Sequence, residues 1–263
     1  MKKAVILSLM IALFGAAAVF AQEEFNLLGR YEDVKLMPEN NTGSTNQFVF
    51  TRLVYNGRIP SYYKNWYTDY PRVDLHIIEA LKRLTNIDIA DKPRSVPIND
   101  PDLFKYPLIY SIETEQMVLT DEDAAHLREY LTRGGFCIID DFWGTFEWSL
   151  VEENLKKILP GRPIKDIPLD HPVFHTLFDV DRLMQTPSGA YFFNGFFITY
   201  ETDGWVPECK GIWDDKDRLM VVINHNTDLK SAYMWSDDPR YPERFSDYAY
   251  KLASNFIIYG LTH

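Results

Sequence analysis

The sequence predicts an α/β protein, a three-layer sandwich in which helices cover both faces of a mostly parallel β-sheet. Short apolar segments of strand length alternate along the chain with longer segments in which apolar residues recur at helical spacing. The 263 residues are 46% hydrophobic and 25% charged, as is typical of a globular domain with a sizeable core. This composition excludes a disordered or low-complexity protein.

The first half of the chain contains three expected strands and one helix. The aromatic and β-branched segment 48–55 ends at an Asn-Gly turn, which is typical of a strand. A helix is expected from Pro71, because the apolar residues after it follow a helical period. The strands are expected at residues 48–55, at either 87–89 or 95–98, and at 107–112.

The middle of the chain predicts a helix, a buried strand and a second helix. Thr120 opens the first helix, with Asp123 three residues later forming an approximate capping box. Segment 136–140 is apolar and ends in acids, as expected where a strand buried on both faces reaches its carboxyl end. The second helix extends through Leu159, where a Pro-Gly pair stops it.

The last third is less regular. The aromatic segment 190–201 is expected to be extended, either as an antiparallel excursion or as an inserted loop. Segment 218–224 reads as another buried strand, and apolar residues on one helical face predict a final helix over 245–257. The chain shows no internal repeat and no linker rich in Pro, Gly or Ser. One domain is therefore expected.

The first 21 residues are predicted to be a secretory signal peptide. Two lysines give a positive start, segment 4–20 is almost wholly apolar, and small residues precede a cleavage point after Ala21. A retained membrane anchor is the alternative, since the apolar run is near the lower length for spanning a bilayer. No later apolar run approaches that length. The mature protein, residues 22–263, is expected to be a single domain in the periplasm or outside the cell.

Charge and cysteine content exclude two classes of protein. The chain has 27 Lys and Arg against 38 Asp and Glu, a net charge of −11, so a basic surface for nucleic acid is not expected. Two cysteines are too few for a disulfide scaffold. Cys137 and Cys209 could pair in an oxidising compartment, but Cys137 lies in an apolar run where a free thiol packs as a small core residue.

Polar residues that could form a site follow the predicted strands at their carboxyl ends. Ligands bind at this edge in open parallel sheets. Asn56 and Glu113 follow two strands, and an aromatic segment with acidic residues precedes the first helix. The candidate binding residues are Trp66, Asp69, Tyr70, Asp74, Asp140, Asp141, Asn224, His225 and Asp228.

Two interpretations of Asp140 and Asp141 are open. As a functional pair, they supply a general base or oxygen ligands for a hard cation, completed by Asp69, Asp74 or Asp228. As structural residues, one caps a loop or the next helix through backbone N–H groups and the other is solvated. The structural interpretation is preferred for each acid taken singly. No cofactor is required by the sequence, and a divalent cation is the alternative.

The histidines and aromatic residues allow both functional and structural interpretations. His225 has no spaced partner, so a hydrogen-bonding role is preferred to catalysis or ligation. His171 and His175 are expected in a turn, because a proline between them disfavours a helical metal face. The five aromatic residues within 62–70 either stack on a sugar, anchor a protein partner, or cover the edge of the core. No Gly-rich phosphate loop, G-x-S-x-G elbow or Cys-x-x-Cys pair is present.

Four motifs together resemble the bacterial family catalogued as domain of unknown function 4159, over roughly residues 48–261. They are Arg52-Leu53-x-Tyr55, Trp66-x-Thr68-Asp69-Tyr70-Pro71-x-x-Asp74, Gly134-Gly135-Phe136 leading to Asp140-Asp141-Phe142, and Asn255-x-x-x-Tyr259. The resemblance implies a flavodoxin-like sheet, similar to that of the class I glutamine amidotransferase-like group.

The amidotransferase activity does not follow from this resemblance. Those enzymes place a cysteine nucleophile on a glycine-flanked strand-to-helix turn and pair it with His and Glu near the C-terminus. Here Cys137 lies within a predicted strand, Cys209 lies among Pro, Glu and Lys, and no His-x-Glu follows. Inheriting the activity would rest on fold analogy alone.

Three functional hypotheses follow from the sequence. The leading one is an exported, non-enzymatic domain that binds an envelope protein partner or a small ligand at the carboxyl edge of its sheet. The alternative is a metal-assisted hydrolase of a glycan or other envelope substrate, with Asp140 or Asp141 as base and a divalent cation or His225 assisting. The third is an assembly subunit in which segment 190–201 packs on another chain.

Overall fold

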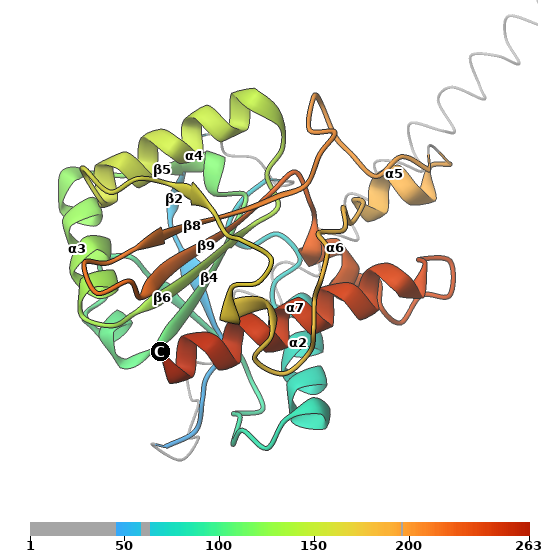
Figure 1. Cartoon of the computed structure of the whole chain (residues 1–263), viewed down its shortest axis with the longest axis horizontal. Helices are drawn as coiled ribbons and strands as arrows, with labels where there is room; N and C mark the ends of the chain where they lie inside the picture. The colour runs from blue at the N-terminus through green and yellow to red at the C-terminus, as the bar shows by residue number, and fades with distance from the viewer. Residues whose placement is uncertain (1–45, 59–63, 196) are drawn as a thin grey trace, which may run out of the picture. The chain divides into compact units, whose positions relative to one another are not determined.

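A seven-stranded, mostly parallel sheet with helices on both sides forms the centre of the described chain (Figure 1). The structure is a computed structural model that describes residues 46–58, 64–195 and 197–263, so the predicted signal peptide lies outside the described residues. All described elements belong to one unit, Gly43–His263. The strands lie in the order β3 (Arg94–Pro97), β1 (Thr51–Val54), β4 (Leu108–Ile112), β6 (Phe136–Asp140), β9 (Leu219–His225), β8 (Glu208–Trp213) and β7 (Lys165–Asp166).

Five neighbouring strands of this sheet are parallel. Strands β3, β1, β4, β6 and β9 run in one direction, and numbered along the chain they have the spatial order 2-1-3-4-5. Strand β8 is antiparallel to β9, and β7 is antiparallel to β8. A separate two-stranded sheet pairs β2 (Asn56–Gly57) with β5 (Met117–Val118), which places Asn56 outside the main sheet.

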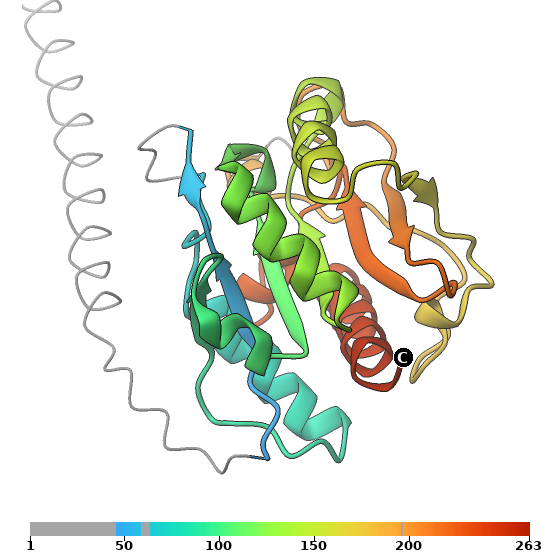
Figure 2. The same ribbon diagram turned by 90° about the vertical axis from the view of Figure 1, so that its left-hand side faces the viewer.

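Helices pack on both faces of the sheet (Figure 2), and an apolar core lies between the sheet and the helices on each face. Helices α3 (Asp121–Thr132) and α4 (Gly144–Ile158) pack on one face, and α2 (Arg72–Leu84), α6 (Leu229–Met234) and α7 (Glu243–Thr262) pack on the other. Along β6, Phe136 and Ile138 belong to the α2, α6 and α7 core, whereas Cys137 and Ile139 belong to the α3 and α4 core. This alternation is what a strand buried on both faces requires.

Both cysteines are free and buried, and they lie in different cores. Cys137 packs toward α3 and α4, and Cys209 packs toward the helices of the opposite face. The preferred interpretation of Cys137 as a core residue is therefore confirmed, and the alternative disulfide is not formed.

Most expected elements are present, with two corrections. The capping box of Thr120 and Asp123 begins α3. The strand expected at either 87–89 or 95–98 is β3, which begins one residue before the second of these positions, at Arg94. Segment 190–201 is not extended as expected, since α5 (Gly189–Phe193) takes up its first part. The antiparallel strand is β8, which was not anticipated because Glu208, Lys210 and Gly211 are residue types that are depleted in strands.

Short 3-10 helices complete the described elements. They are η1 (Pro101–Lys105), η2 (Thr114–Gln116) and η3 (Pro172–Phe174). The last of these confirms the expected turn at His171, whose Nδ1 accepts a hydrogen bond from the N–H of Val173.

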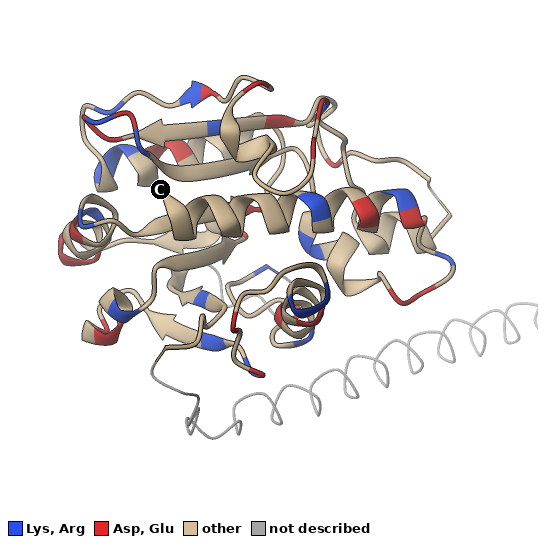
Figure 3. Ribbon diagram, turned by 60° about the horizontal axis from the view of Figure 1, so that its bottom comes forward, with Lys and Arg blue, Asp and Glu red and all other residues tan. Residues whose placement is uncertain are grey.

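Helix length and the distribution of charge bear on two expectations from the sequence. Among the described residues, no helix combines the length and apolarity needed to cross a membrane. Acidic and basic residues are interspersed along the helices in Figure 3. This mixed pattern gives no support to a basic nucleic-acid surface.

Candidate functional site

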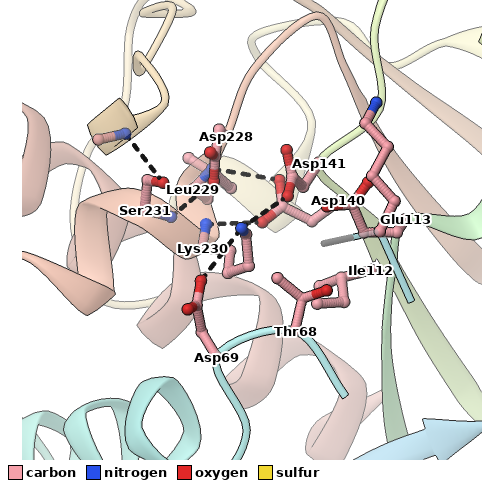
Figure 4. A network of polar contacts seen from close by, with 12 residues as sticks. Thr68, Asp69, Ile112, Glu113, Asp140, Asp141, Asp228, Leu229, Lys230 and Ser231 are labelled. Carbon is pink, nitrogen blue, oxygen red and sulfur yellow. Dashed lines mark hydrogen bonds and ion pairs between the residues drawn. The ribbon is translucent and has the colours of Figure 1, made fainter. Parts of the chain in front are cut away.

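A buried lysine, Lys230, lies at the centre of an acidic cluster where the parallel strands end (Figure 4). Its Nζ is 3.0 Å from Asp141 Oδ2 and 3.2 Å from Asp69 Oδ2. The Lys230 and Asp141 side chains are 8% and 6% exposed, and Asp69 is 29% exposed. Lys230 therefore joins the loop before α2, the end of β6 and the first turn of α6. We call Asp69, Glu113, Asp141, Asp228 and Lys230 the Lys230 cluster.

The acids of the cluster keep this lysine charged. Burial alone lowers the pKa of an ammonium group, but the nearby charges of Asp141, Asp228 and Asp69 raise the pKa of Lys230 well above its ordinary value. A lysine in this state is a fixed cation rather than a nucleophile or a base. It holds two carboxylates in place from inside the protein.

Asp140 has a structural role beside the cluster. Its carboxylate accepts hydrogen bonds from Tyr110 Oη at 2.7 Å and from the backbone N–H groups of Leu229 and Lys230 at 3.3 and 3.0 Å. Burial, together with the charge of Asp141, raises its pKa to about 7. One of the two adjacent acids thus caps a helix, as the structural interpretation expected, but the helix is α6 rather than the next one along the chain.

The other acid, Asp141, is not solvated as that interpretation expected. It is buried against Lys230, and its Oδ1 also accepts a hydrogen bond from Trp143 Nε1 at 3.3 Å. Asp228 caps the start of α6 through a 2.6 Å hydrogen bond from the N–H of Ser231. Burial and the charge of Asp141 raise the pKa of Asp228 well above its ordinary value.

Three members of the cluster have left-handed backbone conformations. The φ angles of Asp69, Glu113 and Asp141 are +57°, +47° and +61°. Such conformations cost non-glycine residues roughly 1–3 kcal/mol each and concentrate at ligand sites, where the surrounding structure enforces them. Burial and the charge of Asp141 raise the pKa of Glu113 well above its ordinary value. The strain accompanies a dense group of buried charges at the carboxyl edge.

Asp74 supports the segment that carries Asp69. It is fully buried and paired with Arg52, whose Nε and Nη2 donate hydrogen bonds to its carboxylate at 3.2 and 2.5 Å. Arg52 Nη1 also donates to the carbonyl of Trp66 at 3.2 Å. Asp74 has no exposed surface for a ligand, so the geometry gives it a positioning role rather than a binding one.

The predicted aromatic residues of this segment are half-buried. The rings of Trp66 and Tyr70 lie 6.0 Å apart, and Trp66 packs against the core beneath α3 and α4. Tyr62 and Tyr63 lie outside the described residues. The described part of the segment both covers the core and remains partly accessible beside Asp69.

The last two predicted residues lie away from the Lys230 cluster. Asn224 donates a hydrogen bond to the carbonyl of Ile139 at 3.2 Å and so ties β9 to β6. His225 stacks on Phe142 with 4.9 Å between ring centroids, and its Nδ1 is 2.9 Å from Glu208 Oε2. It lies on the α4 side of the sheet and does not assist Asp140 or Asp141.

The acids do not converge as metal ligands would. Within the described ranges, no group of three or more His, Cys, Asp or Glu side chains has an arrangement that could hold a metal ion. The Lys230 ammonium lies between Asp69 and Asp141, where a shared cation would have to sit. The geometry therefore gives no support to the alternative of a divalent cation at these acids.

Exposed apolar side chains lie at the same edge of the sheet. Asp203, in the loop before β8, accepts hydrogen bonds from Thr145 N at 3.0 Å and Thr145 Oγ1 at 2.7 Å. These bonds hold the loop against the start of α4. Gly144 permits this contact, because its φ is +69° and a Cβ there would lie 2.0 Å from Asp203 Oδ1. Beside this junction are three apolar side chains with exposed fractions of 66–73%, here called the apolar patch: Phe146, Trp205 and Val206.

Sequence reasoning missed Lys230 and the apolar patch. Lysines are rarely buried, and large apolar residues are usually assigned to the core wherever they stand in the chain. A signal for Lys230 was its place two residues after Asp228, beyond a buried strand, where its side chain had to share space with the acids that end the neighbouring strands.

A comparison with models of protein families gives a match over most of the chain. The model of the family described as "Domain of unknown function (DUF4159)" matches residues 49–261, close to the range expected from the four motifs. The search of curated proteins gave no match.

Proposed function

The chain belongs to the DUF4159 family, and on this premise we propose that it is an exported, non-enzymatic domain that binds a protein partner at the carboxyl edge of its sheet. In this proposal residues 1–21 are a cleaved signal peptide, and residues 22–263 form one periplasmic or secreted domain. A small ligand at the same edge is the second candidate occupant.

The strand order supports a flavodoxin-like, amidotransferase-like scaffold for this binding. The spatial order 2-1-3-4-5 of the parallel strands is the flavodoxin-like order, in which ligands bind where the order reverses, between the first and third strands. These strands are β1 and β4. Glu113 directly follows β4, and Arg52 of β1 holds the segment that carries Asp69.

The observation that carries the proposal is the Lys230 cluster itself. Five charged groups from four separate segments meet there, and three of them adopt strained backbone conformations. A fold needs no such group at a loop edge for stability, because buried ion pairs are often no more stabilising than apolar packing. A preorganised polar centre surrounded by accessible side chains is the arrangement expected of a binding site.

The apolar patch favours a protein over a small ligand. Phe146, Trp205 and Val206 present large apolar side chains to solvent beside acidic loops. Exposed aromatic residues at the centre of a polar surface are typical of protein interfaces. The partner expected is therefore one that presents apolar side chains together with basic ones.

Neither enzymatic alternative is favoured by the geometry. Burial raises the pKa of the Cys137 thiol to about 12 and raises that of Cys209 further, so neither is an activated nucleophile. Metal-assisted hydrolysis would need a free carboxylate as the base, but Asp140 already accepts three hydrogen bonds and Asp141 is paired with Lys230. His225 stacks on Phe142 on the other face of the sheet.

Site-specific photo-crosslinking tests the proposal. A photoreactive phenylalanine analogue is placed at Trp205, or at the exposed Ala125 on α3 as the matched control, and the full chain is produced in its source cells. The expected result is one adduct of defined mass at position 205 and none at 125. The Phe146→Ser variant should reduce the adduct at least fivefold. No adduct at 205, or equal adducts at both positions, would refute partner binding at this edge.

A further inference from the structure

We infer that a groove between α4 and strand β8 is a second binding site, with the chemistry to hold a neutral carbohydrate. The groove has a volume of about 550 Å³, which lies within the range of small-molecule sites. Five of its lining residues belong to α4, so it lies on the α3 and α4 side of the sheet, whereas Lys230 belongs to the first turn of α6 on the opposite side. Its polar lining includes Glu152, Lys156, Arg162, Glu208, Lys210 and His225.

An aromatic wall is the first feature of this groove. Trp148 is half-buried, and its ring lies 5.0 Å from that of His225. Phe142 stacks behind both rings, with its centroid 4.9 Å from His225 and 6.2 Å from Trp148. Trp148 and His225 line the groove and the fully buried Phe142 supports them from behind, which gives a rigid surface on which the C–H face of a sugar can rest at low entropic cost.

The charged side chains of the lining neutralise one another. Lys210 Nζ is 2.6 Å from Asp166 and 3.2 Å from Glu208, whose other oxygen is 2.9 Å from His225 Nδ1. Lys156 pairs with Glu152 at 2.9 Å. Arg162 is likewise paired, with Asp215 at 2.9 Å.

This pairing determines which ligand class fits. An anionic ligand would have to compete with a carboxylate for every cation, and a cationic ligand would have to compete with a lysine or arginine for every acid. A hydroxyl group both donates and accepts, so a polyol can bridge the existing pairs without separating them. The groove therefore presents fixed donors, fixed acceptors and an aromatic wall to a neutral ligand.

Saturation-transfer NMR on the full chain tests this inference, with glucose, N-acetylglucosamine, cellobiose and chitobiose as neutral probes. Glucose 6-phosphate and glucosamine are the charged comparisons. We expect transfer to the ring protons of at least one neutral sugar, and transfer at least fivefold weaker to both charged ones. The Trp148→Ala variant should lose the signal at least tenfold, and Phe197→Ala, which alters an exposed aromatic residue outside the groove, should retain it.

A second variant covers the case in which Trp148→Ala does not fold. Glu208→Gln keeps the shape of the side chain but removes the charge shared by Lys210 and His225, and it should weaken binding at least threefold with an unchanged circular dichroism spectrum. The inference is overturned by no transfer from any of the four neutral sugars, by stronger binding of either charged sugar, or by binding that neither variant changes.

Discussion

At the scale of single residues, the most informative side chain is Lys230. It is buried, it contacts Asp69 and Asp141, and the charges of Asp228 and Glu113 also act on it. Removing one partner of a buried ion pair leaves the other charge without compensation, which costs far more than the pair contributes as a whole. Lys230 is thus the residue on which the geometry of the cluster depends.

The Lys230→Met variant should lower the free energy of unfolding by about 3–5 kcal/mol at pH 7. Urea denaturation of both proteins measures this difference. Adding Asp141→Asn to Lys230→Met should restore part of the loss, because it removes one of the uncompensated charges. The control is Arg83→Met, which breaks an exposed pair with Glu79 and should cost about 1 kcal/mol or less. Equal losses in the two single variants would contradict this role for Lys230.

At the scale of elements, the sequence was sufficient where local chemistry and burial agree. The apolar run ending at Asp140 is β6, and the capping box of Thr120 begins α3, since both depend on residues adjacent in the chain. The segment 190–201 was wrongly expected to be extended because aromatic residues favour strands. Phe192 and Phe193 instead belong to the short helix α5 and pack against Tyr241. Tertiary contacts there outweigh local preference.

Asn255 shows how one helix positions a distant loop. Its Oδ1 accepts hydrogen bonds from the N–H groups of Leu177 and Phe178, each at 2.9 Å, and its Nδ2 donates to the carbonyls of Phe174 and Phe178 at 2.8 and 2.7 Å. Its place in a family motif therefore has a structural explanation, which the sequence did not reveal because the loop is more than 70 residues away.

The Asn255→Ala variant should lower the free energy of unfolding by about 3 kcal/mol, since four backbone groups, one buried and three part-buried, lose a partner. Hydrogen exchange at the amides of Leu177 and Phe178 should accelerate more than exchange within β6. The control Lys251→Ala changes an exposed residue on the same helix and should leave both exchange rates unaltered. Uniform acceleration throughout the protein would mean that Asn255 does not hold this loop in particular.

At the scale of the whole molecule, the fold gathers acids that are far apart in the sequence. The sequence predicted the carboxyl edge as the site and most of its acids, because parallel strands end on one side of a sheet. It could not predict which acids would be buried together or that His225 would face the opposite core, since both depend on the register of β9 and on the position of α6.

This concentration of acids makes stability depend on pH. The pKa of Asp140 rises from an ordinary 3.8 to about 7, chiefly through burial, and those of Glu115 and Glu201 also rise to about 7. A carboxyl group with a raised pKa binds its proton more tightly in the folded state. Its contribution to stability is therefore complete below the unfolded pKa and is lost as the pH rises through the folded pKa.

The free energy of unfolding should accordingly fall between pH 5 and pH 8, with Asp140 alone accounting for about 3 kcal/mol. Urea denaturation at each pH unit measures the profile. The Asp140→Asn variant, which cannot ionise, should have a flatter profile than the wild type. Asp215→Asn should leave the slope unchanged, because Asp215 is exposed and its pKa is lowered by Arg162, so it stays ionised throughout this range. Two results would contradict this prediction: a free energy of unfolding that rises from pH 5 to pH 8 in the wild type, or a profile that Asp140→Asn does not flatten. Either would show that Asp140 remains ionised within the fold and that Lys230 compensates its charge as well.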